Sequence, residues 1–352
     1  MMKLADCLLN WYDECKRDLP WRRDKDPYKI WVSEVMLQQT RVEVVRAYFE
    51  RWIERFPTLQ SLAEAQEDEV IQYWQGLGYY SRARNLHQGA REVATSYDGQ
   101  MPMTKNEVAG LSGIGDYTSG AILSIAYDQK EPAIDGNVLR VFSRLYCIEG
   151  DIATPMIKRQ IREQVEKEMA IDRPGDFNQA LMDLGATVCI PKAPRCEECP
   201  LLKSCCAKDK GMQQQLPIKK KKVPPVPVEV VAGVLQDGEL FLLRKRPKKG
   251  LLAGMWEFPA IEIPVGENSM EVFQRGFLCE TGQEVQMAKL LLQCIHIFSH
   301  RKWDISFYHC TYEDGNRPLG KDLFWVNKSD WDKISFAGPH RKMANYLLNE
   351  MD

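Results

Sequence analysis

The chain has 352 residues, of which 44% are hydrophobic and 27% charged, and its formal net charge at pH 7 is −2. This length favours two domains, and no apolar stretch is long enough to cross a bilayer. The near-neutral charge gives no electrostatic argument for nucleic acid, so any DNA-binding face must come from segregated charge. Acidic residues also interrupt any apolar core of a signal peptide near the N-terminus, and we expect a cytosolic location.

Residues 1 to about 205 are predicted to be helical, because apolar residues recur at three- and four-residue steps with capping residues between the segments. One such stripe runs over 27–52 and another over 176–188. Stripes of this kind are typical of helices that bury one face in a core. We therefore expect an all-α first domain over residues 1–206.

Glu34 lies in the first of these stripes, with Ile30, Trp31 and Leu37 on its own helical face. It is therefore expected to point at an apolar surface. Desolvation there raises the pKa of a carboxyl group and leaves an acid able to donate a proton near neutral pH. A glutamate among apolar residues is more often a partly buried salt-bridge partner, and the helix alone leaves both interpretations open.

Gly113 and Gly115 precede a helix predicted over residues 116–127. Backbone amides at such a helix N-terminus can approach a phosphate, although glycines before a helix often form only a turn. Asp135 follows this helix and begins a further helical segment. An isolated aspartate at a helix start is most often its N-cap.

The chain contains eleven cysteines, and five of them fall between Cys189 and Cys206. In a reducing compartment, clustered cysteines are better candidates for metal ligands than for disulfides. The four whose spacing lets their thiolates converge in one compact loop are Cys189, Cys196, Cys199 and Cys205. A zinc ribbon more often uses two CxxC pairs, whereas this loop has one. Cys206 is left as a spare cysteine.

The composition changes at residues 207–227, where Lys, Gln and Pro predominate and no core can form. We interpret this segment as an interdomain linker. Beyond it the apolar residues alternate on either side of an Asp237-Gly238 turn, which predicts a β-hairpin, and the second domain, residues 228–352, is predicted to be α+β. The expected elements are strands at 228–235, 239–243, 294–298 and 305–310, and a helix from Arg341.

The cysteine spacing, the segment 31–40 around Glu34 and the segment that begins at Asp135 together resemble the MutY family of adenine DNA glycosylases, within the endonuclease III superfamily. The resemblance spans nearly the whole chain, and the linker matches least. It implies a multidomain protein with an all-α helix-hairpin-helix DNA glycosylase domain and a C-terminal α+β Nudix-like domain. The helix-hairpin-helix motif would span about 105–127, and the loop at 189–205 would bind a [4Fe–4S] cluster through its four cysteines.

The resemblance also implies catalytic roles. Glu34 would protonate adenine at N7, and Asp135 would stabilise the oxocarbenium-like state at C1′ or trap it covalently. Asn137 would orient that carboxylate or the sugar. Bifunctional relatives carry a lysine at the position of Tyr117, which attacks C1′ and forms a Schiff base. Because a phenol cannot form an imine, we expect a monofunctional glycosylase without efficient strand cleavage.

Contacts with DNA follow from the same resemblance. The side chains expected to line or gate the adenine pocket are Trp21, Arg22, Leu37 and Gln179. The residues expected to contact the duplex are Gln39, Thr40, Tyr79, Gly113 and Gly115. An aromatic pair after glycines is usually part of a core, and Tyr79 is open to that interpretation.

The C-terminal domain resembles MutT-like Nudix proteins, but its Nudix box is broken. Gly276 and Cys279 occupy positions where carboxylates should bind magnesium, and only Glu280 remains, so pyrophosphate hydrolysis is not expected. In the MutY family this domain recognises 8-oxoguanine. The residues expected to read the damaged base, in the predicted hairpin turn, are Phe298, Ser299 and His300. An ordinary exposed hairpin tip is the alternative.

Together these expectations describe a monomeric adenine glycosylase that acts on double-stranded DNA containing adenine opposite 8-oxoguanine or guanine. We expect a cytoplasmic, bacterial-type protein that reaches the nucleoid through DNA and has no membrane partner. An endonuclease III-like glycosylase and lyase is a second interpretation, which Tyr117 and the second domain oppose. A non-catalytic iron–sulfur sensor of DNA damage is a third, which Glu34 and Asp135 oppose, and a nucleotide pyrophosphohydrolase is a fourth.

Overall fold

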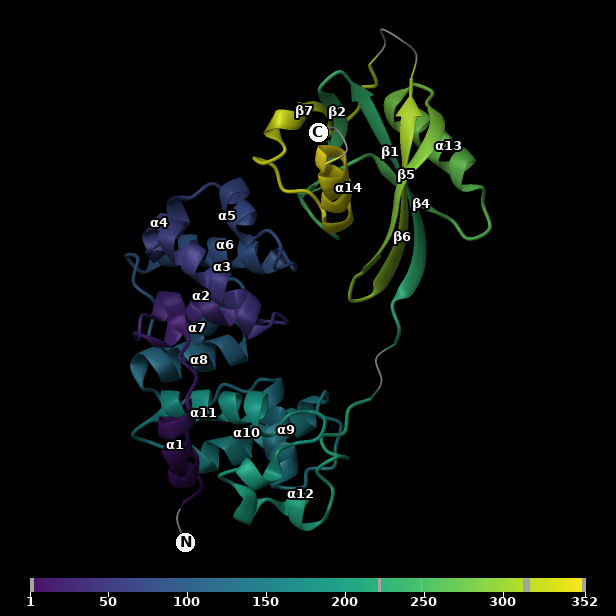
Figure 1. Ribbon diagram of the computed structural model, residues 1–352. Coiled ribbons are helices and arrows are strands. Elements are labelled where there is room, and N and C mark those ends of the chain that lie inside the picture. The colour runs from purple at the N-terminus through teal and green to yellow at the C-terminus, as the bar shows by residue number, and fades with distance from the viewer. Residues whose placement is uncertain (1–2, 221–222, 248, 313–316, 350–352) are drawn as a thin grey trace. The chain divides into compact units, whose positions relative to one another are not determined.

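The structure is a computed structural model, and the residues it describes are 3–220, 223–247, 249–312 and 317–349. The chain divides into two compact units (Figure 1). The first comprises residues 1–73 and 81–221, and the second comprises residues 74–80 and 222–352. Among the described residues, none of the helices has the length and apolar character that crossing a bilayer requires.

The first unit is built from helices. Its α-helices are α1 (Leu4–Cys15), α2 (Pro27–Leu37), α3 (Val42–Arg55), α4 (Leu59–Glu64), α5 (Glu67–Trp74, whose last residue falls in the second unit), α6 (Ser81–Ser96), α7 (Lys105–Gly110), α8 (Asp116–Tyr127), α9 (Gly136–Leu145), α10 (Pro155–Glu168), α11 (Pro174–Thr187) and α12 (Cys206–Asp209). Its 3-10 turns are η1 (Pro20–Arg22), η2 (Cys196–Glu198) and η3 (Leu202–Ser204). The apolar stripe over 27–52 therefore belongs to two helices, α2 and α3, and not to one.

These helices pack in two groups that meet at α8 and α11 (Figure 1). In one group α2 packs against α3, α6 and α8, and in the other α11 packs against α1 and α9. Glycines permit the closest approaches. A Cβ on Gly120 of α8 would lie 2.3 Å from the Pro132 carbonyl oxygen, and one on Gly185 of α11 would lie 2.5 Å from the Asn137 Cβ. The N-terminus of α9 is therefore held tightly against α11.

The second unit is built on a mixed β-sheet. Its elements are β1 (Val226–Asp237), β2 (Leu240–Lys245), β3 (Trp256–Glu257), β4 (Ala260–Ile263), α13 (Ser269–Thr281), β5 (Gln286–Ile297), β6 (Arg301–Thr311), β7 (Leu323–Asn327), η4 (Lys328–Asp330) and α14 (Gly338–Asn349). The strand order is β3-β2-β1-β6-β5, with β4 paired to β1 and β7 paired to β2. The β1–β6 pair is parallel and the other pairs are antiparallel.

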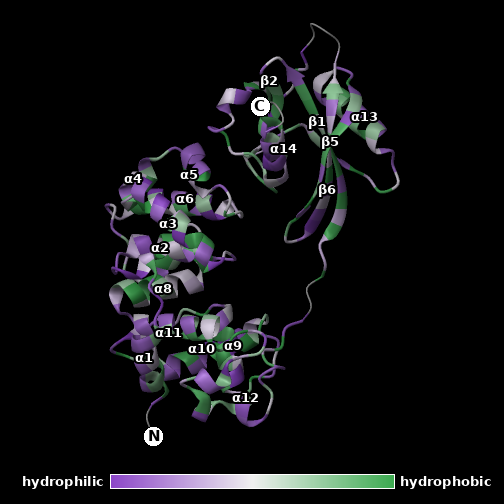
Figure 2. Cartoon of the chain, in the orientation of Figure 1, coloured by the Kyte–Doolittle hydropathy of each residue, from purple (hydrophilic) through white to green (hydrophobic). Residues whose placement is uncertain are grey.

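A helix covers each face of this sheet. Because side chains alternate along a strand, Val230 and Val234 of β1 enter a core with α14, whereas Val231 and Leu235 enter a second core with α13. Figure 2 shows hydrophobic residues along β1 in the second unit and along α9 in the first, and both elements are largely buried. The predicted β1–β2 hairpin is present, with Gly238 at φ +58° in its turn. Strands β3, β4 and β7 and helix α13 were not predicted from the sequence.

Candidate functional site

A cavity of about 980 Å³ lies in the helical unit, lined by residues of η1, α2, α8, α9 and α11. The residues predicted from sequence that line it are Trp21, Arg22, Glu34, Leu37, Gln39, Thr40, Tyr117, Asp135, Asn137 and Gln179. The fold therefore brings together side chains from segments that are far apart along the chain. The remaining predicted positions lie elsewhere, at the hairpin before α8, in segment 74–80, in the cysteine loop and in the second unit.

Glu34 is buried on α2, and only 5% of its surface is exposed. The Tyr117 hydroxyl donates a hydrogen bond to Glu34 Oε2. The pKa of Glu34 is raised from 4.5 to about 7, chiefly because the carboxyl group is buried and also because Asp135 is near, although the Tyr117 hydrogen bond and the Arg22 charge lower it. Among the described residues no cation forms an ion pair with Glu34, so the salt-bridge interpretation does not describe this side chain.

Asp135 caps α9. Its Oδ1 accepts hydrogen bonds from the backbone N–H of Asn137 and of Val138, each at 2.8 Å, and its Oδ2 accepts one from Asn137 Nδ2 at 2.7 Å. Burial raises the pKa of Asp135, and these hydrogen bonds, together with the Arg140 charge, oppose that rise by favouring the carboxylate. The aspartate is therefore both an N-cap and a wall of the cavity.

Arg140, which was not predicted from the sequence, fixes the Asn137 side chain that contacts Asp135. It donates from Nη2 to Asn137 Oδ1 at 2.8 Å and to the Gly185 carbonyl at 2.7 Å, and from Nε to the Cys189 carbonyl at 2.7 Å. The Asn137 amide is thus held with its Nδ2 toward the carboxylate. An arginine within an apolar helix was the signal available in the sequence.

The hairpin before α8 has the expected form. Gly113 has φ +81°, and a Cβ there would lie 2.7 Å from the Asn85 Cβ, so the position requires glycine. Gly115 is extended and caps α8 without a side chain, which leaves the first amides of the helix accessible. Helices α7 and α8 flank this turn, as predicted for residues 105–127.

Tyr79 has φ +48° and is 48% exposed. It belongs to segment 74–80, which clusters with the second unit. The core interpretation of this tyrosine therefore does not hold. Its contact with DNA stays a prediction.

The turn between β5 and β6 carries the three residues predicted to read the lesion. Ser299 and His300 are exposed, whereas Phe298 is half-buried. The Phe298 ring packs at 5.0 Å from that of Trp303 and at 4.5 Å from that of His296. The turn therefore presents two polar side chains next to a cluster of packed aromatic rings.

In the broken Nudix box, the remaining carboxylate Glu280 is paired with an arginine. The guanidinium of Arg244 donates to both oxygens of Glu280 at 3.1 and 3.2 Å, and to Glu257 at 2.8 Å. Glu257 is buried and is also paired with Arg246 at 2.6 Å. Arginine side chains thus form ion pairs with these carboxylates, which are then not available as ligands of a metal ion.

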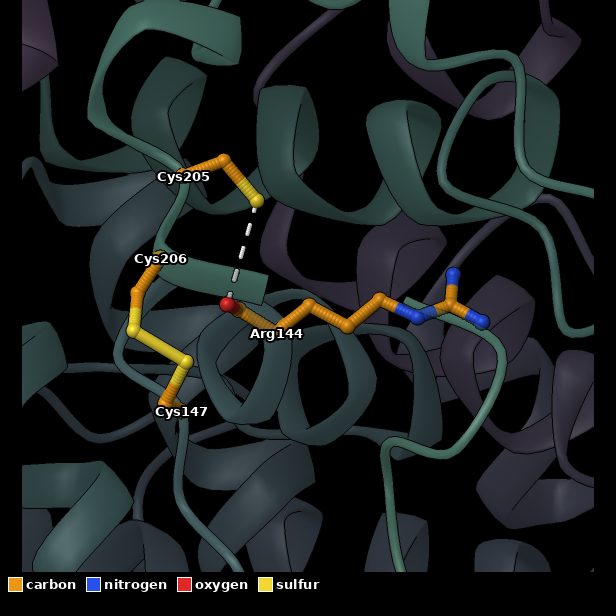
Figure 3. The surroundings of a disulfide bond; sticks show 4 residues. All are labelled: Arg144, Cys147, Cys205 and Cys206. Atoms are coloured by element: carbon orange, nitrogen blue, oxygen red, sulfur yellow. Dashed lines mark hydrogen bonds between the residues drawn. A yellow bond between two sulfur atoms is a disulfide. The ribbon is translucent and has the colours of Figure 1, made fainter. Parts of the chain in front are cut away.

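The four predicted ligand cysteines line one small pocket, together with Arg144 and Gln213. Arg144 donates from Nη1 to Cys189 Sγ at 3.3 Å, and the Cys205 thiol points at the Arg144 carbonyl at 3.8 Å (Figure 3). Burial and, to a smaller extent, the neighbouring cysteines raise the pKa of the Cys199 thiol to about 12. Four thiolates in this pocket would therefore repel one another unless a cation lay among them. In the described part of the chain, no three His, Cys, Asp or Glu side chains are arranged as the ligands of a single metal ion.

The expectation that Cys206 is a spare cysteine was wrong. Cys206 forms a disulfide with Cys147, which follows α9 (Figure 3). Helix α12 packs against α9, and this contact brings the two cysteines to a Cα–Cα distance of 5.7 Å although 59 residues separate them. No local sequence signal could have indicated this pair.

Comparisons with known proteins identify the family of the chain and the relatives of its two domains. Residues 32–167 match the family described as HhH-GPD superfamily base excision DNA repair protein, and residues 230–346 match the NUDIX domain. The chain is 36% identical to an adenine DNA glycosylase of Rattus norvegicus, over 94% of this chain and 74% of the relative, and 33% identical to one of Schizosaccharomyces pombe, over 95% and 87%. A thermostable thymine-DNA glycosylase structure is 27% identical and superimposes with a TM-score of 0.54, covering 58% of this chain and 95% of that one.

Proposed function

The chain belongs to the adenine DNA glycosylase family, within the HhH-GPD superfamily of base excision repair proteins, and from that membership we propose that it excises adenine paired with 8-oxoguanine or guanine in double-stranded DNA, leaving an abasic site. The observation that carries the proposal is the cavity wall in which a buried, hydrogen-bonded Glu34 and a capped Asp135 lie together. Cleavage of an N-glycosidic bond requires an acid that can protonate the leaving base and a carboxylate that can stabilise the positive charge at C1′.

Glu34 acts as the general acid. Adenine is a poor leaving group as an anion, and protonation at N7 lets it depart neutral. With a pKa of about 7, Glu34 is protonated in a substantial fraction of molecules at neutral pH, which neither an exposed glutamate nor an ion-paired one would be. Tyr117 Oη holds Glu34 Oε2 and thereby directs the other oxygen of the carboxyl group.

Asp135 stabilises the positive charge that develops at C1′ as adenine leaves. Its hydrogen bonds from Asn137 and Val138 orient the carboxylate before the reaction, so little reorganisation is needed in the transition state. Water then captures C1′. Tyr117, at the position of the lysine of bifunctional relatives, has no amine for a Schiff base, and the proposed product is an intact strand with an abasic site.

Recognition of 8-oxoguanine is assigned to the second unit. The exposed Ser299 and His300 supply a hydroxyl and an imidazole, which are able to donate and accept hydrogen bonds at a base edge. Arg244 pairs with Glu280 and so removes a possible magnesium ligand, which supports recognition of a base in this unit over hydrolysis of a pyrophosphate.

The test of this assignment compares single-turnover adenine excision opposite 8-oxoguanine, guanine and thymine. The wild-type protein is expected to prefer the first duplex and to leave the third uncut. The double variant Ser299→Ala with His300→Ala should lose about 30-fold of the preference for 8-oxoguanine over guanine, since each of the two hydrogen bonds contributes about 1 kcal/mol. Ser329→Ala, at an exposed 3-10 turn of the same unit, is the control. An unchanged preference in the double variant would remove this turn from the account.

The four cysteines that share one pocket are proposed to bind a [4Fe–4S] cluster. Its role, when bound, is to neutralise the four thiolates and to fix the loop 189–205 against α9. The four cysteines line one small pocket, and their single CxxC differs from the two CxxC pairs more usual in a zinc ribbon, which favours the cluster over a single zinc ion. Arg144 holds the first of these cysteines in place, because its Nη1 donates to the carbonyl and the thiol of Cys189 and to the Ile190 carbonyl.

Replacement of a proposed ligand gives a direct test. Cys196→Ser is expected to lose bound iron and the visible absorption of the protein, because one of four ligands is gone. The exposed free Cys15 is the matched control, and Cys15→Ser should retain both signals. Iron analysis and absorption spectra of the purified proteins make the measurement. Zinc in place of iron in the wild-type protein would contradict the proposal.

A further inference from the structure

A buried carboxylate, Asp183, lies directly behind the wall of the cavity. It is 1% exposed and belongs to α11. Its helical neighbours Gln179, Met182 and Ala186 line the cavity, and this spacing places all four residues toward one side of the helix. Nothing in the proposed chemistry uses Asp183 directly.

Two arginines converge on this carboxylate. Arg22 donates from Nη1 to Asp183 Oδ2 at 2.8 Å and from Nη2 to Oδ1 at 2.9 Å, a bidentate pair. Arg17 donates from Nε to Oδ1 at 2.9 Å and from its backbone N–H to Oδ2 at 3.3 Å. The Arg22 guanidinium also lies 5.8 Å from the ring of Tyr12. Asp183 therefore determines where the Arg22 side chain lies and compensates part of its charge.

Arg22 is the cation that acts on Glu34. Three polar or charged groups act on the pKa of Glu34: Tyr117 from α8, Asp135 from α9 and Arg22 from η1. The further cations that line the same cavity are Arg17, Lys158, Arg159 and Arg162. Arg22 lowers the pKa of Glu34, against the effect of burial. An uncompensated Arg22 would lower that pKa further.

We propose that Asp183 is a positioning residue for adenine excision, which fixes Arg22 in the cavity wall and offsets its positive charge beside the general acid Glu34. Asp183 touches neither substrate nor reacting atoms. Its effect passes entirely through Arg22. This inference rests on the proposed function, because it presumes that Glu34 delivers a proton to adenine.

The variant Asp183→Asn tests the proposal through the pH dependence of single-turnover excision. Without the carboxylate charge, Glu34 loses its proton at lower pH, so the descending limb of the pH–rate profile should move about one unit toward acid. The rate should fall about tenfold at pH 8 and much less at pH 6. Asp176→Asn, on the same helix at a partly exposed ion pair with Arg173, should reproduce the wild-type profile.

A purely structural role would lower the rate by one factor at every pH. That uniform loss, an unmoved limb, or a limb moved toward alkali would each overturn the proposal. A double-mutant cycle guards against a variant that folds poorly. In an Arg22→Gln background, where the ion pair between Arg22 and Asp183 is already absent and only that with Arg17 remains, adding Asp183→Asn should leave the limb in place, and a further acid shift would contradict action through Arg22. If the wild-type protein released no adenine, the proposed function itself would fail, whatever the variants did.

Discussion

Glu34→Gln is expected to lower single-turnover excision of adenine opposite 8-oxoguanine about 10³-fold, within the range for loss of a general acid. Glutamine has nearly the shape of the protonated carboxyl group and can still accept a hydrogen bond from the Tyr117 hydroxyl. It cannot transfer a proton to adenine N7. Affinity for the same duplex, measured by titration, should stay within a few-fold of the wild type. A rate within tenfold of wild type would exclude Glu34 as the acid.

The same variant has an expected effect on stability that controls for misfolding. The pKa of Glu34 in the folded protein, about 7, exceeds its ordinary value of 4.5. The buried group therefore destabilises the fold at a pH at which it would be ionised in the unfolded chain, and not at lower pH. The cost is absent below pH 4.5 and fully present above about pH 7, and it amounts to about 3 kcal/mol. Glu34→Gln should therefore unfold at a higher temperature than wild type at pH 8, and at nearly the same temperature at pH 4.5.

The wild-type pH profile follows from the same group. Excision needs protonated Glu34, so its rate should fall as pH rises through about 7. In Glu34→Gln this descending limb should disappear along with most of the activity. A wild-type rate constant that stayed level from pH 6 to pH 9 would contradict proton donation by Glu34.

Asp135→Asn is expected to lower excision about 10³-fold, the scale on which removal of an electrostatic stabiliser acts. The amide oxygen of asparagine can still accept the two backbone hydrogen bonds that cap α9. The negative charge facing C1′ is lost, together with the hydrogen bond that Asn137 Nδ2 donates to Oδ2. Single-turnover rates, with thermal unfolding alongside, make the measurement.

Asp26→Asn is the matched control for that experiment. Asp26 caps α2 by accepting from the backbone N–H of Tyr28 at 2.9 Å, and it does not line the cavity. The same substitution at this cap should leave excision near wild type. Equal losses in the two variants would show that capping, and not charge at C1′, explains the effect of Asp135.

The sequence indicated the fold class and the chemistry of the site because their signals are local. The matches to a helix-hairpin-helix repair family and to a Nudix domain confirm the two-domain fold that was predicted. Helical periodicity placed Glu34 on an apolar face within one helix, and the structure buries it there. The hairpin at 105–127 and the N-cap at Asp135 are likewise set by a few adjacent residues.

What could not be predicted depends on contacts between distant segments. Asp183 and Arg22 are separated by 161 positions, and only the packing of α11 beside η1 makes them a pair. The same holds for the Cys147–Cys206 disulfide. In the second unit, β3 has two residues and β4 four, so neither is long enough for the alternation that marked β1.

The most direct test of the account is a single-turnover reaction on a duplex with one adenine opposite 8-oxoguanine, in which free adenine is quantified and strand integrity is read before and after alkali. The account predicts stoichiometric release of adenine and strand breakage only after alkali, because Tyr117 offers no amine to C1′. Strand breakage without alkali, or tight binding of the duplex with no adenine released, would contradict it.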